Sequence, residues 1–416
     1  MTINSELIKI GREAKKAARY MRMLSTDDKN KILLACADAL ENNTAYIIEE
    51  NKKDMERLDK SRKAFADRLM LNESRIKGLA TGLRKVSALD DPVGEILYMR
   101  TMPNGLQIGE QRTPLGVVGM IYEARPNVTA DAFGLCVKSG NACILRGGSE
   151  AINSHMVVVK VLHDTLIKLN HPETIVQLIE DTSREVAAQF MKLNEYVDVL
   201  IPRGGAGLIN STVQNSTIPV IETGIGNCHI FVDESADSEK AVPLIINAKT
   251  QRPSVCNSCE KLLVHKAVAE SFLPVICNEL ASCGVEIRGD AEVCRIYPKA
   301  APASEDDWYE EYVDLIIAVK VVNDIDEAIE HIGTYSSGHT EAILTENYNN
   351  MRKFTNEVDS AAVFVNASTR FTDGEEFGLG AEMGISTQKL HVRGPMGLKA
   401  LTSTKFVGYG NGHIRK

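Results

Sequence analysis

The stretch "GVVGMIY", residues 116 to 122, decides the fold class, because this almost unbroken apolar run leads into a segment with helical periodicity at 129–139. Apolar runs of the same kind recur further along the chain and alternate with helical segments. The runs lie at 141–147, 173–179, 197–202, 218–222 and 228–232, and the helical segments at 150–169, 183–193 and 204–213. Continuous apolar strands that alternate with helices are typical of a parallel sheet covered on both faces. The sequence therefore predicts an α/β fold, in which ligands bind at the carboxyl ends of the strands.

Three other regions complete the predicted architecture. Residues 4–90 carry apolar side chains every three or four positions between charges, which predicts helices that end at "DDPVGE" (90–95). Asn104-Gly105 then separates two alternating runs within 97–116, the strongest short-range signal for a β-hairpin. A second block of apolar runs predicts a further α/β domain. Its runs lie at 260–265, 284–289, 315–322, 341–346 and 361–366.

Composition and charge limit the possible functions. The chain has 416 residues, of which 44% are hydrophobic, enough for two or three domains with their own cores. Its formal charge of −9, without any block of Lys and Arg, argues against a nucleic-acid binder. Residues 1–25 lack the apolar core of a signal peptide, and no later run is long enough to cross a bilayer. The nine scattered cysteines do not form a secreted disulfide pattern, so we expect a cytoplasmic protein with reduced thiols.

Three loops at predicted strand ends are rich in glycine: "LRGGSE" (145–150), "IPRGGAG" (201–207) and "IETGIGN" (221–227). Glycine lets backbone amides approach a phosphate, and a helix that begins after such a loop adds favourable partial charge. The loops therefore suit a dinucleotide, although none matches G-x-G-x-x-G and each could equally be a structural turn. Arg146 precedes two glycines at a strand end, where its guanidinium could bind a ribose 2′-phosphate or form a surface ion pair.

The stretch "QRPSVCNSCEK" (251–261) holds the cysteine that differs most from the others. Cysteine is usually a small buried hydrophobic residue, and the apolar surroundings of Cys36, Cys136, Cys143 and Cys277 fit that role. Cys256 lies instead among small polar residues near an arginine, where a thiolate could be reached and stabilised. A redox pair with Cys259 is an alternative, and zinc would need ligands beyond His265.

Several motifs together resemble the aldehyde dehydrogenase superfamily in their order and spacing. They are "PLGVVGMIYEARPN" (114–127), "LRGGSEA" (145–151), "IPRGG" (201–205), "PVIETGIGN" (219–227) and "QRPSVCN" (251–257). The resemblance spans essentially the whole chain. It implies a Rossmann-like cofactor domain, an α/β catalytic domain and a small β element for oligomerisation. In this chain the three parts correspond to residues 1–96 and 117–228, to 229–393, and to 97–116 and 394–416.

The resemblance also implies a reaction. The motifs are most similar to the branch of the family that reduces γ-glutamyl phosphate to glutamate 5-semialdehyde with NADPH in proline biosynthesis. Cys256 would then be the nucleophile and would carry the acyl group as a thioester. The Cys256 amide and Asn127 would stabilise the oxyanion, although a gapless alignment places the family's oxyanion asparagine over Arg125. Glu222 matches the glutamate that activates water in hydrolytic relatives. It is expected here to assist proton transfer or the cofactor, or to be held away from the thioester.

The same resemblance supplies candidates for binding residues. Those expected to hold NADPH are Arg146, Gly148, Ser149, Gly204, Gly205 and Glu311, with Glu311 at the nicotinamide ribose. Those expected to hold the substrate are Arg125, Arg252, Arg370, Ser403 and Thr404, the arginines at its anionic groups. No metal site is expected. The protruding hairpin implies a homo-oligomer, dimer or tetramer, and association with glutamate 5-kinase, which makes the labile substrate, is left open.

Overall fold

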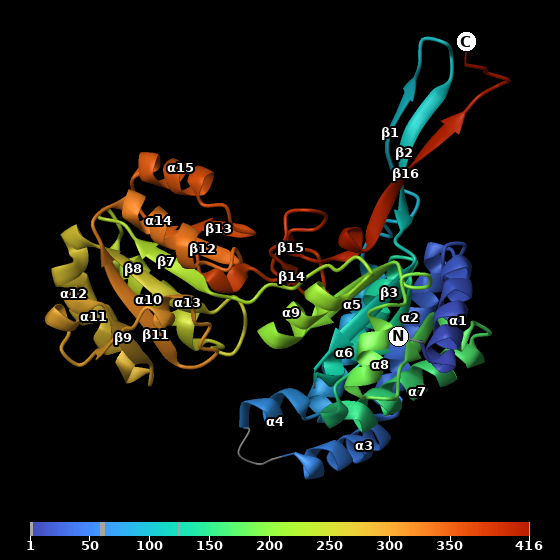
Figure 1. The fold of residues 1–416 in the computed structure, drawn as a ribbon, viewed down its shortest axis with the longest axis horizontal. Coiled ribbons are helices and arrows are strands. Elements are labelled where there is room, and N and C mark those ends of the chain that lie inside the picture. The colour runs from blue at the N-terminus through green and yellow to red at the C-terminus, as the bar shows by residue number, and fades with distance from the viewer. Residues whose placement is uncertain (1–2, 59–62, 124, 416) are drawn as a thin grey trace. The chain divides into compact units, whose positions relative to one another are not determined.

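The structure is a computed structural model that describes residues 3–58, 63–123 and 125–415 (Figure 1). The chain divides into two compact units. Unit 1 comprises residues 1–223, 378–384 and 396–416, and unit 2 comprises residues 224–377 and 385–395. Each unit contains a parallel sheet with helices, which confirms the predicted α/β class.

The N-terminal part of unit 1 is helical, as the periodicity of residues 4–90 predicts. The helices are α1 (Ser5–Met21), α2 (Thr26–Asn42), α3 (Thr44–Arg57), α4 (Lys63–Leu69) and α5 (Glu73–Ala88). Side chains before α2 and α5 cap their first turns: Ser25 accepts from the Asp28 amide, and Asn72 from the Arg75 amide. Such caps satisfy amides that have no partner within the helix, so the local sequence fixes where these helices begin.

Unit 1 is built on a four-stranded parallel sheet in the order β5-β4-β3-β6. Its strands are β3 (Val117–Tyr122), β4 (Ala142–Arg146), β5 (Val176–Leu178) and β6 (Val199–Arg203). Its later helices are α6 (Pro126–Lys138), α7 (Ile152–Lys168), α8 (Arg184–Phe190) and α9 (Ala206–Asn215), with 3₁₀ turns η1 (Ser149–Ala151) and η2 (Glu173–Ile175). Every residue of β3 is buried, as expected for a central strand covered on both faces. The turns after β4 and β6 are the "LRGGSE" and "IPRGGAG" loops.

The apolar run at 218–222 is not a strand, contrary to the prediction. Only one isolated bridge forms there, between Val220 and Leu200 of β6. The Leu200 amide donates to the Pro219 carbonyl, and the Ile221 amide donates to the Leu200 carbonyl. Pro219 has no amide hydrogen to continue a ladder, so the pairing ends after these two bonds.

A three-stranded antiparallel sheet forms the remainder of unit 1 and confirms the predicted hairpin. It consists of β1 (Ile96–Thr101), β2 (Gln107–Pro114) and β16 (Thr402–Tyr409), with β2 in the centre. At the tip, Gly105 has φ of 89°, a conformation that glycine adopts without strain. Figure 1 shows this sheet extending away from the helices of the same unit. Phe406 and Tyr409 are exposed on it.

Unit 2 contains a seven-stranded parallel sheet in the order β10-β9-β11-β8-β7-β12-β13. Its strands are β7 (Cys228–Val232), β8 (Cys259–His265), β9 (Glu286–Gly289), β10 (Ala301–Pro302), β11 (Ile316–Val322), β12 (Thr340–Leu344) and β13 (Ala362–Val365). Its helices are α10 (Ser238–Thr250), α11 (Lys266–Ser282), α12 (Ala291–Ile296), α13 (Asp306–Tyr309), α14 (Ile325–Tyr335) and α15 (Tyr348–Glu357). The short remaining elements are β14 (Ile385–Ser386), β15 (Gly394–Pro395) and η3 (Thr369–Phe371) in unit 2, and η4 (Leu398–Leu401) in unit 1.

Alternate residues of β8 face the two layers of helices in unit 2. Leu262 and Val264 belong to a buried cluster with residues of α10 and α11. Leu263, between them, belongs to a second buried cluster with residues of α14 and α15. This alternation follows from the period of two along a strand. Both faces of the sheet are therefore covered, and β8 is held rigidly where it leaves the Cys256 stretch.

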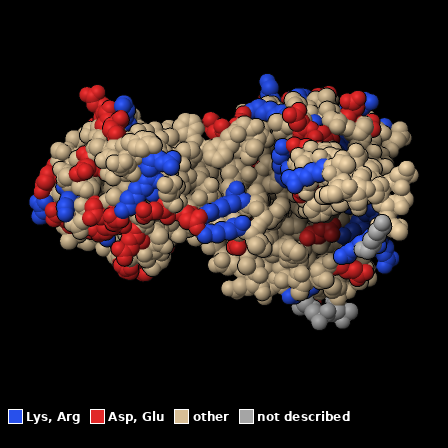
Figure 2. All heavy atoms as spheres, turned by 90° about the horizontal axis from the view of Figure 1, so that it is seen from above, with Lys and Arg blue, Asp and Glu red and all other residues tan. Residues whose placement is uncertain are grey.

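Two further observations concern the surface and the helices. Among the described residues, no helix is long and apolar enough to cross a bilayer. On the face drawn in Figure 2, Lys and Arg are interspersed with Asp and Glu on each unit. Neither unit shows there the concentrated basic face that a phosphate backbone requires.

Candidate active site

Cys256 lies in the turn between α10 and β8 of unit 2. The Ser258 amide donates to the Val255 carbonyl at 3.0 Å, which closes the turn around the cysteine. The next residue, Asn257, is buried; its carbonyl accepts from the Thr369 hydroxyl at 2.7 Å, and its side-chain amide donates to the Thr372 carbonyl at 3.0 Å. The turn is thus fixed to the segment around η3. Cys256 itself is only partly buried, in contrast to the neighbouring Asn257.

The backbone of Cys256 is in close contact with the "GIGN" loop. A Cβ placed on Gly226 would lie 1.6 Å from the Cys256 carbonyl oxygen, so only glycine allows the two chain segments to approach this closely. The Cys228 thiol donates to the same carbonyl at 3.1 Å. Burial, with the charge of Glu341 adding to it, raises the pKa of Cys228, which keeps this thiol protonated and able to donate. The loop thus supports the turn that carries Cys256.

One predicted substrate residue, Arg370, interacts electrostatically with Cys256. Burial lowers the pKa of the Arg370 guanidinium, and the positive charge of Arg252 lowers it further. The Cys256 sulfur acts in the opposite direction, because its thiolate favours the charged guanidinium. By the same interaction, the guanidinium favours the thiolate over the thiol. The structure therefore brings the charge of Arg370 near the partly buried Cys256, and the charge of Arg252 near Arg370.

Arg370 also lines a cavity of about 330 Å³ in unit 2. The cavity is lined by Asn247, Gln251, Arg370, Phe371, Asp373, Glu375 and Glu376. The Arg370 Nε donates to the Gln251 side-chain oxygen at 3.0 Å, which orients the guanidinium. Asp373 accepts from the Glu375 amide at 2.9 Å, which fixes the following turn. One cationic and several anionic groups thus face the same space, a combination that sequence analysis did not foresee.

Most of the other cysteines are buried, whereas Cys283 is exposed and Cys294 is partly buried like Cys256. No disulfide joins any of the nine. Cys36, Cys136, Cys143 and Cys277 are buried, which confirms their structural assignment. Cys259 has no exposed surface, and burial raises its pKa to about 12, so it stays a thiol at neutral pH. The redox-pair interpretation of Cys256 and Cys259 therefore has little support.

Glu311 is the one predicted cofactor residue that lies in unit 2. Its carboxylate accepts a hydrogen bond from the Gly226 amide at 2.7 Å. Gly226 is the residue that lies against the Cys256 carbonyl. Glu311 is thus connected to the Cys256 turn through a single intervening residue.

The predicted pyrophosphate turn, Gly204 and Gly205, lies in unit 1 at the start of α9. The Gly205 amide donates to the Glu123 carboxylate at 3.1 Å, and a Cβ on Gly204 would lie 2.7 Å from the same carboxyl group. Around Gly207, no described atom lies within 4 Å of where a Cβ would be. In this structure the Glu123 carboxylate therefore occupies the Gly205 amide, and open space among the described atoms of this turn remains only beside Gly207. Sequence analysis missed Glu123, although it lies in the "YEARPN" motif.

Arg146, Gly148 and Ser149 lie together at the end of β4 in unit 1. The Arg146 guanidinium donates to the Thr182 carbonyl, and to the Ser183 carbonyl at 3.1 Å. Its Nε is buried and has no hydrogen-bond partner among the described residues. Burial lowers the pKa of Arg146. Ser149 is exposed, next to a buried Gly148. The carbonyls of Thr182 and Ser183 thus hold the Arg146 guanidinium at the end of β4.

Asn127, Arg125 and Glu222 also belong to unit 1. Arg125 is the residue before α6, and the Asn127 side-chain amide, on the first turn of that helix, donates to Asp131 at 3.1 Å. Burial raises the pKa of Asp131 to about 6. Glu222 is partly buried, directly before the end of unit 1 at Thr223. Asn127 is exposed, so its amide can also be reached from solvent.

Ser403 and Thr404 lie on β16, where both are exposed. They pair with Thr113 and Arg112 of β2 in the three-stranded antiparallel sheet. Neither residue lines the cavity at Arg370 or the cavity in unit 1 described below. Their backbone is paired within the sheet, and both residues are exposed.

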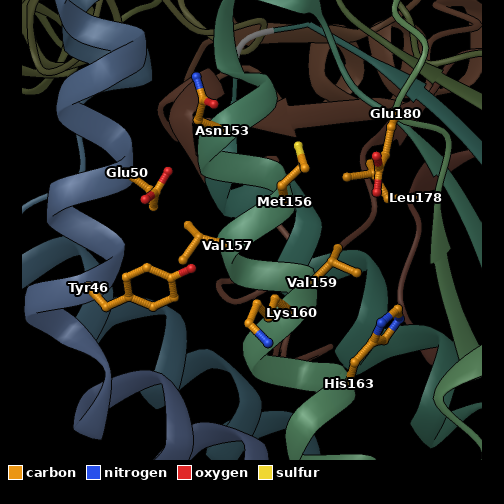
Figure 3. Close-up of a pocket in the computed structure, with 10 residues that line it drawn as sticks. All are labelled: Tyr46, Glu50, Asn153, Met156, Val157, Val159, Lys160, His163, Leu178 and Glu180. Atoms are coloured by element: carbon orange, nitrogen blue, oxygen red, sulfur yellow. The ribbon is translucent and has the colours of Figure 1, made fainter.

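A second cavity, of about 290 Å³, lies between α3 and α7 in unit 1 (Figure 3). Tyr46 and Glu50 project into it from α3, and Lys160 and His163 project from α7. None of the predicted site residues lines it. Glu180, which lines the cavity, lies two residues before Thr182, whose carbonyl accepts from Arg146.

A buried ion pair joins the helix before the Cys256 turn to the strand after it. The Lys249 ammonium lies 3.1 Å from the Glu260 carboxylate, and both side chains are fully buried. Burial raises the pKa of Glu260 to about 7. The sequence shows Lys249 at the end of a helix and Glu260 at the start of an apolar strand. It gives no sign that the two side chains are buried, because charged side chains are usually solvated.

Comparisons with known proteins place this geometry in a family. The profile of the aldehyde dehydrogenase family matches residues 4–298. The chain is 58% identical to the gamma-glutamyl phosphate reductase of Clostridium botulinum over 412 residues, which cover 99% of this chain and 100% of that protein. It is 58% identical to the protein of the same name from Caldanaerobacter subterraneus over 407 residues, covering 97% and 98%.

Solved structures agree with these sequence matches. The crystal structure of gamma-glutamyl phosphate reductase from Thermotoga maritima superposes with a TM-score of 0.96 at 50% identity, covering 99% of this chain and 100% of that chain. An acetylating aldehyde dehydrogenase from Geobacillus thermoglucosidasius shares the fold at 18% identity, with a TM-score of 0.71 and coverage of 99% and 98%. The chain belongs to the aldehyde dehydrogenase family, whose members use a nicotinamide cofactor.

Proposed function

We propose that this protein reduces γ-glutamyl phosphate to glutamate 5-semialdehyde and phosphate, with NADPH, as a step of proline biosynthesis. The proposal is supported by relatives that carry the name gamma-glutamyl phosphate reductase and match the whole chain at 58% identity. The observation that carries it is Cys256: a partly buried residue in a fixed turn, which interacts electrostatically with the Arg370 guanidinium. We infer a cytoplasmic setting, since the nine thiols form no disulfide.

Cys256 acts as the nucleophile in this proposal. Its thiolate attacks the γ-carbonyl carbon, the new S–C bond forms, and phosphate leaves with the electron pair of the broken C–O bond. The resulting thioester is a far better hydride acceptor than a carboxylate. When bound, the nicotinamide cofactor supplies that hydride. The hemithioacetal on Cys256 then collapses, which releases the aldehyde and returns the sulfur to its starting state.

The arginines bind the anionic groups of the substrate. Arg370 and Arg252 stabilise both the thiolate and an incoming anion, because each guanidinium offers several fixed donors. The cavity at Arg370 suits the α-amino-acid end of the substrate: the guanidinium takes the α-carboxylate, and Asp373 and Glu376 face the α-ammonium. Arg125 is the third candidate for an anion, on the evidence of its motif alone.

Asn127 donates to the oxyanion that forms during attack, together with the Cys256 amide. Preorganised donors of this kind are each worth about 3 kcal/mol in the transition state. The contact with Asp131 holds the Asn127 side chain by its amide group, which orients the donor. Glu222 assists proton transfer rather than water attack, since hydrolysis of the thioester would waste the acyl phosphate.

Residues of unit 1 hold the cofactor. Gly204 and Gly205 receive the pyrophosphate at the start of α9, and Gly148 and Ser149 lie beside the ribose. Arg146 binds the 2′-phosphate through its guanidinium, which the carbonyls of Thr182 and Ser183 hold at the end of β4. This arrangement predicts a preference for NADPH over NADH.

The three-stranded sheet serves assembly in the proposed function. Its strands carry exposed apolar side chains, including Ile96, Phe406 and Tyr409, which a second copy of the chain would cover. We therefore propose a homo-oligomer, either a dimer or a tetramer. Association with glutamate 5-kinase would protect the labile acyl phosphate between the two reactions.

The proposal is tested in the reverse direction with glutamate 5-semialdehyde, phosphate and NADP. We expect continued formation of NADPH only when phosphate is present, and Cys256→Ser to abolish it while cofactor binding persists. Turnover without phosphate would identify a hydrolytic aldehyde dehydrogenase instead. Full activity of Cys256→Ser would remove the nucleophile from the proposal.

A further inference from the structure

The Cys256 turn is closed at its base by the buried ion pair of Lys249 and Glu260. Lys249 lies in the last turn of α10, which leads into the Cys256 turn, and Glu260 lies on β8, which leaves it. Their side chains pair at 3.1 Å without any exposed surface. A buried charge that loses its partner is strongly unfavourable, so the pair holds both ends of the turn at a fixed separation.

The same strand also holds the segment that carries Glu311. The Glu260 carboxylate accepts from the Tyr312 amide at 3.3 Å. The Lys261 ammonium donates to the Glu310 carbonyl at 2.6 Å and lies 4.5 Å from the centre of the Tyr312 ring. The backbone on each side of Glu311 is therefore fixed to β8.

Glu311 completes a closed path of contacts back to the cysteine. Its carboxylate accepts from the Gly226 amide at 2.7 Å, a charge-assisted hydrogen bond. Gly226 in turn lies against the Cys256 carbonyl, with no room for a side chain between them. If Gly226 moved, the Cys256 carbonyl would lose its support on that side.

We propose that Glu311 is a positioning residue for the Cys256 nucleophile: through Gly226 it holds the turn in the conformation in which the sulfur reacts. This role differs from the ribose contact that the family resemblance implies. The inference rests on the proposed role of Cys256 as nucleophile. It concerns the reactivity of the sulfur, which is measurable without substrate or cofactor.

The test compares two substitutions at Glu311 with a matched control. Glu311→Ala removes the acceptor for the Gly226 amide, whereas Glu311→Gln keeps an oxygen in that place. Glu330→Ala, at an exposed glutamate on α14 in the same unit, is the control. The measurements are the rate of Cys256 alkylation by iodoacetamide as a function of pH, the dissociation constant of NADPH, and the reverse kcat. Alkylation is followed by mass spectrometry of the peptide that contains Cys256, because Cys283 is also exposed.

Since a misplacement of about 1 Å can lower a rate about 100-fold, we expect Glu311→Ala to lower kcat by that order. The pH dependence of Cys256 alkylation should shift in Glu311→Ala. NADPH affinity and the unfolding midpoint of this variant should stay near those of the wild type. Glu311→Gln should restore most of the kcat and the profile. An unchanged alkylation profile with weakened NADPH binding would overturn the inference in favour of a cofactor contact. Equal losses of kcat in Glu311→Gln and Glu311→Ala would overturn the inference too, because the glutamine keeps an oxygen that can accept from the Gly226 amide.

If kcat cannot be measured because the substrate is not the proposed one, the alkylation rates still decide the matter. A changed profile in Glu311→Ala, restored in Glu311→Gln, supports positioning whatever the acyl substrate is. Failure of the phosphate-dependent assay with normal alkylation behaviour would therefore count against the proposed function alone.

Discussion

Replacing Gly226 by alanine tests how tightly the "GIGN" loop supports the nucleophile. The added Cβ would lie 1.6 Å from the Cys256 carbonyl oxygen and 2.4 Å from its Cα. To reach an ordinary contact of 3.4 Å, the two segments must separate by about 1.8 Å. A shift of this size moves the Cys256 turn or breaks the Gly226 contact with Glu311. Because about 1 Å of misplacement can lower a rate about 100-fold, we expect turnover to fall by at least that factor, or about 2.7 kcal/mol in the barrier.

The fold should survive this substitution. Overpacking a tight site costs about 1–3 kcal/mol, less than the roughly 5–15 kcal/mol by which proteins are usually stable. The assay is the phosphate-dependent reverse reaction, with urea unfolding as the check on folding. Gly333→Ala on α14 is the matched control, since no described atom lies within 4 Å of its added Cβ. Wild-type turnover in a folded Gly226→Ala protein would refute the reasoning, as would an equal loss in Gly333→Ala.

Three further predictions concern the cofactor, the substrate and the response to pH. Arg146→Ala should weaken NADPH binding more than NADH binding in titrations of both cofactors; equal losses would contradict 2′-phosphate recognition. Glu376→Gln should raise the KM for the semialdehyde with little change in kcat, and an unchanged KM would remove it from the ammonium site. Asp131→Asn should stabilise the protein at neutral pH, because burial raises the pKa of Asp131 from 3.8 to about 6. A carboxyl group whose pKa is raised by folding stabilises the folded state fully below its unfolded pKa of 3.8. This stabilisation is lost as the pH rises through the folded pKa of about 6. The stability advantage of Asp131→Asn in urea unfolding should therefore shrink between about pH 6 and pH 4; a constant advantage would contradict it.

Local patterns were enough to predict most of the fold. The strands β3 and β4 were predicted from continuous apolar runs, because a strand that is covered on both faces is apolar at every position. The hairpin followed from Asn104-Gly105, whose turn preference depends on two adjacent residues. The prediction at 218–222 was wrong because hydrophobicity alone does not register that Pro219 lacks an amide hydrogen.

The candidate site was predicted less completely, because its contacts join distant parts of the chain. Cys256 was found from its polar surroundings, which are local. The bond from Gly226 to Glu311 spans 85 positions, and that from Gly205 to Glu123 spans 82. No periodicity links such residues, and only the fold brings them together. Cys256 and Arg370, whose charges interact, could be proposed from sequence, whereas the groups that hold the Cys256 turn in place could not.

The central claim, a thioester on Cys256 that is released by phosphate, is tested most directly by the first turnover. The protein is mixed rapidly with glutamate 5-semialdehyde and NADP in the absence of phosphate, and NADPH is followed by its absorbance. We predict a burst of about one NADPH for each Cys256, then a halt, with continued turnover once phosphate is added and no burst in Cys256→Ser. Steady NADPH formation without phosphate, or a burst that persists in Cys256→Ser, would contradict the account.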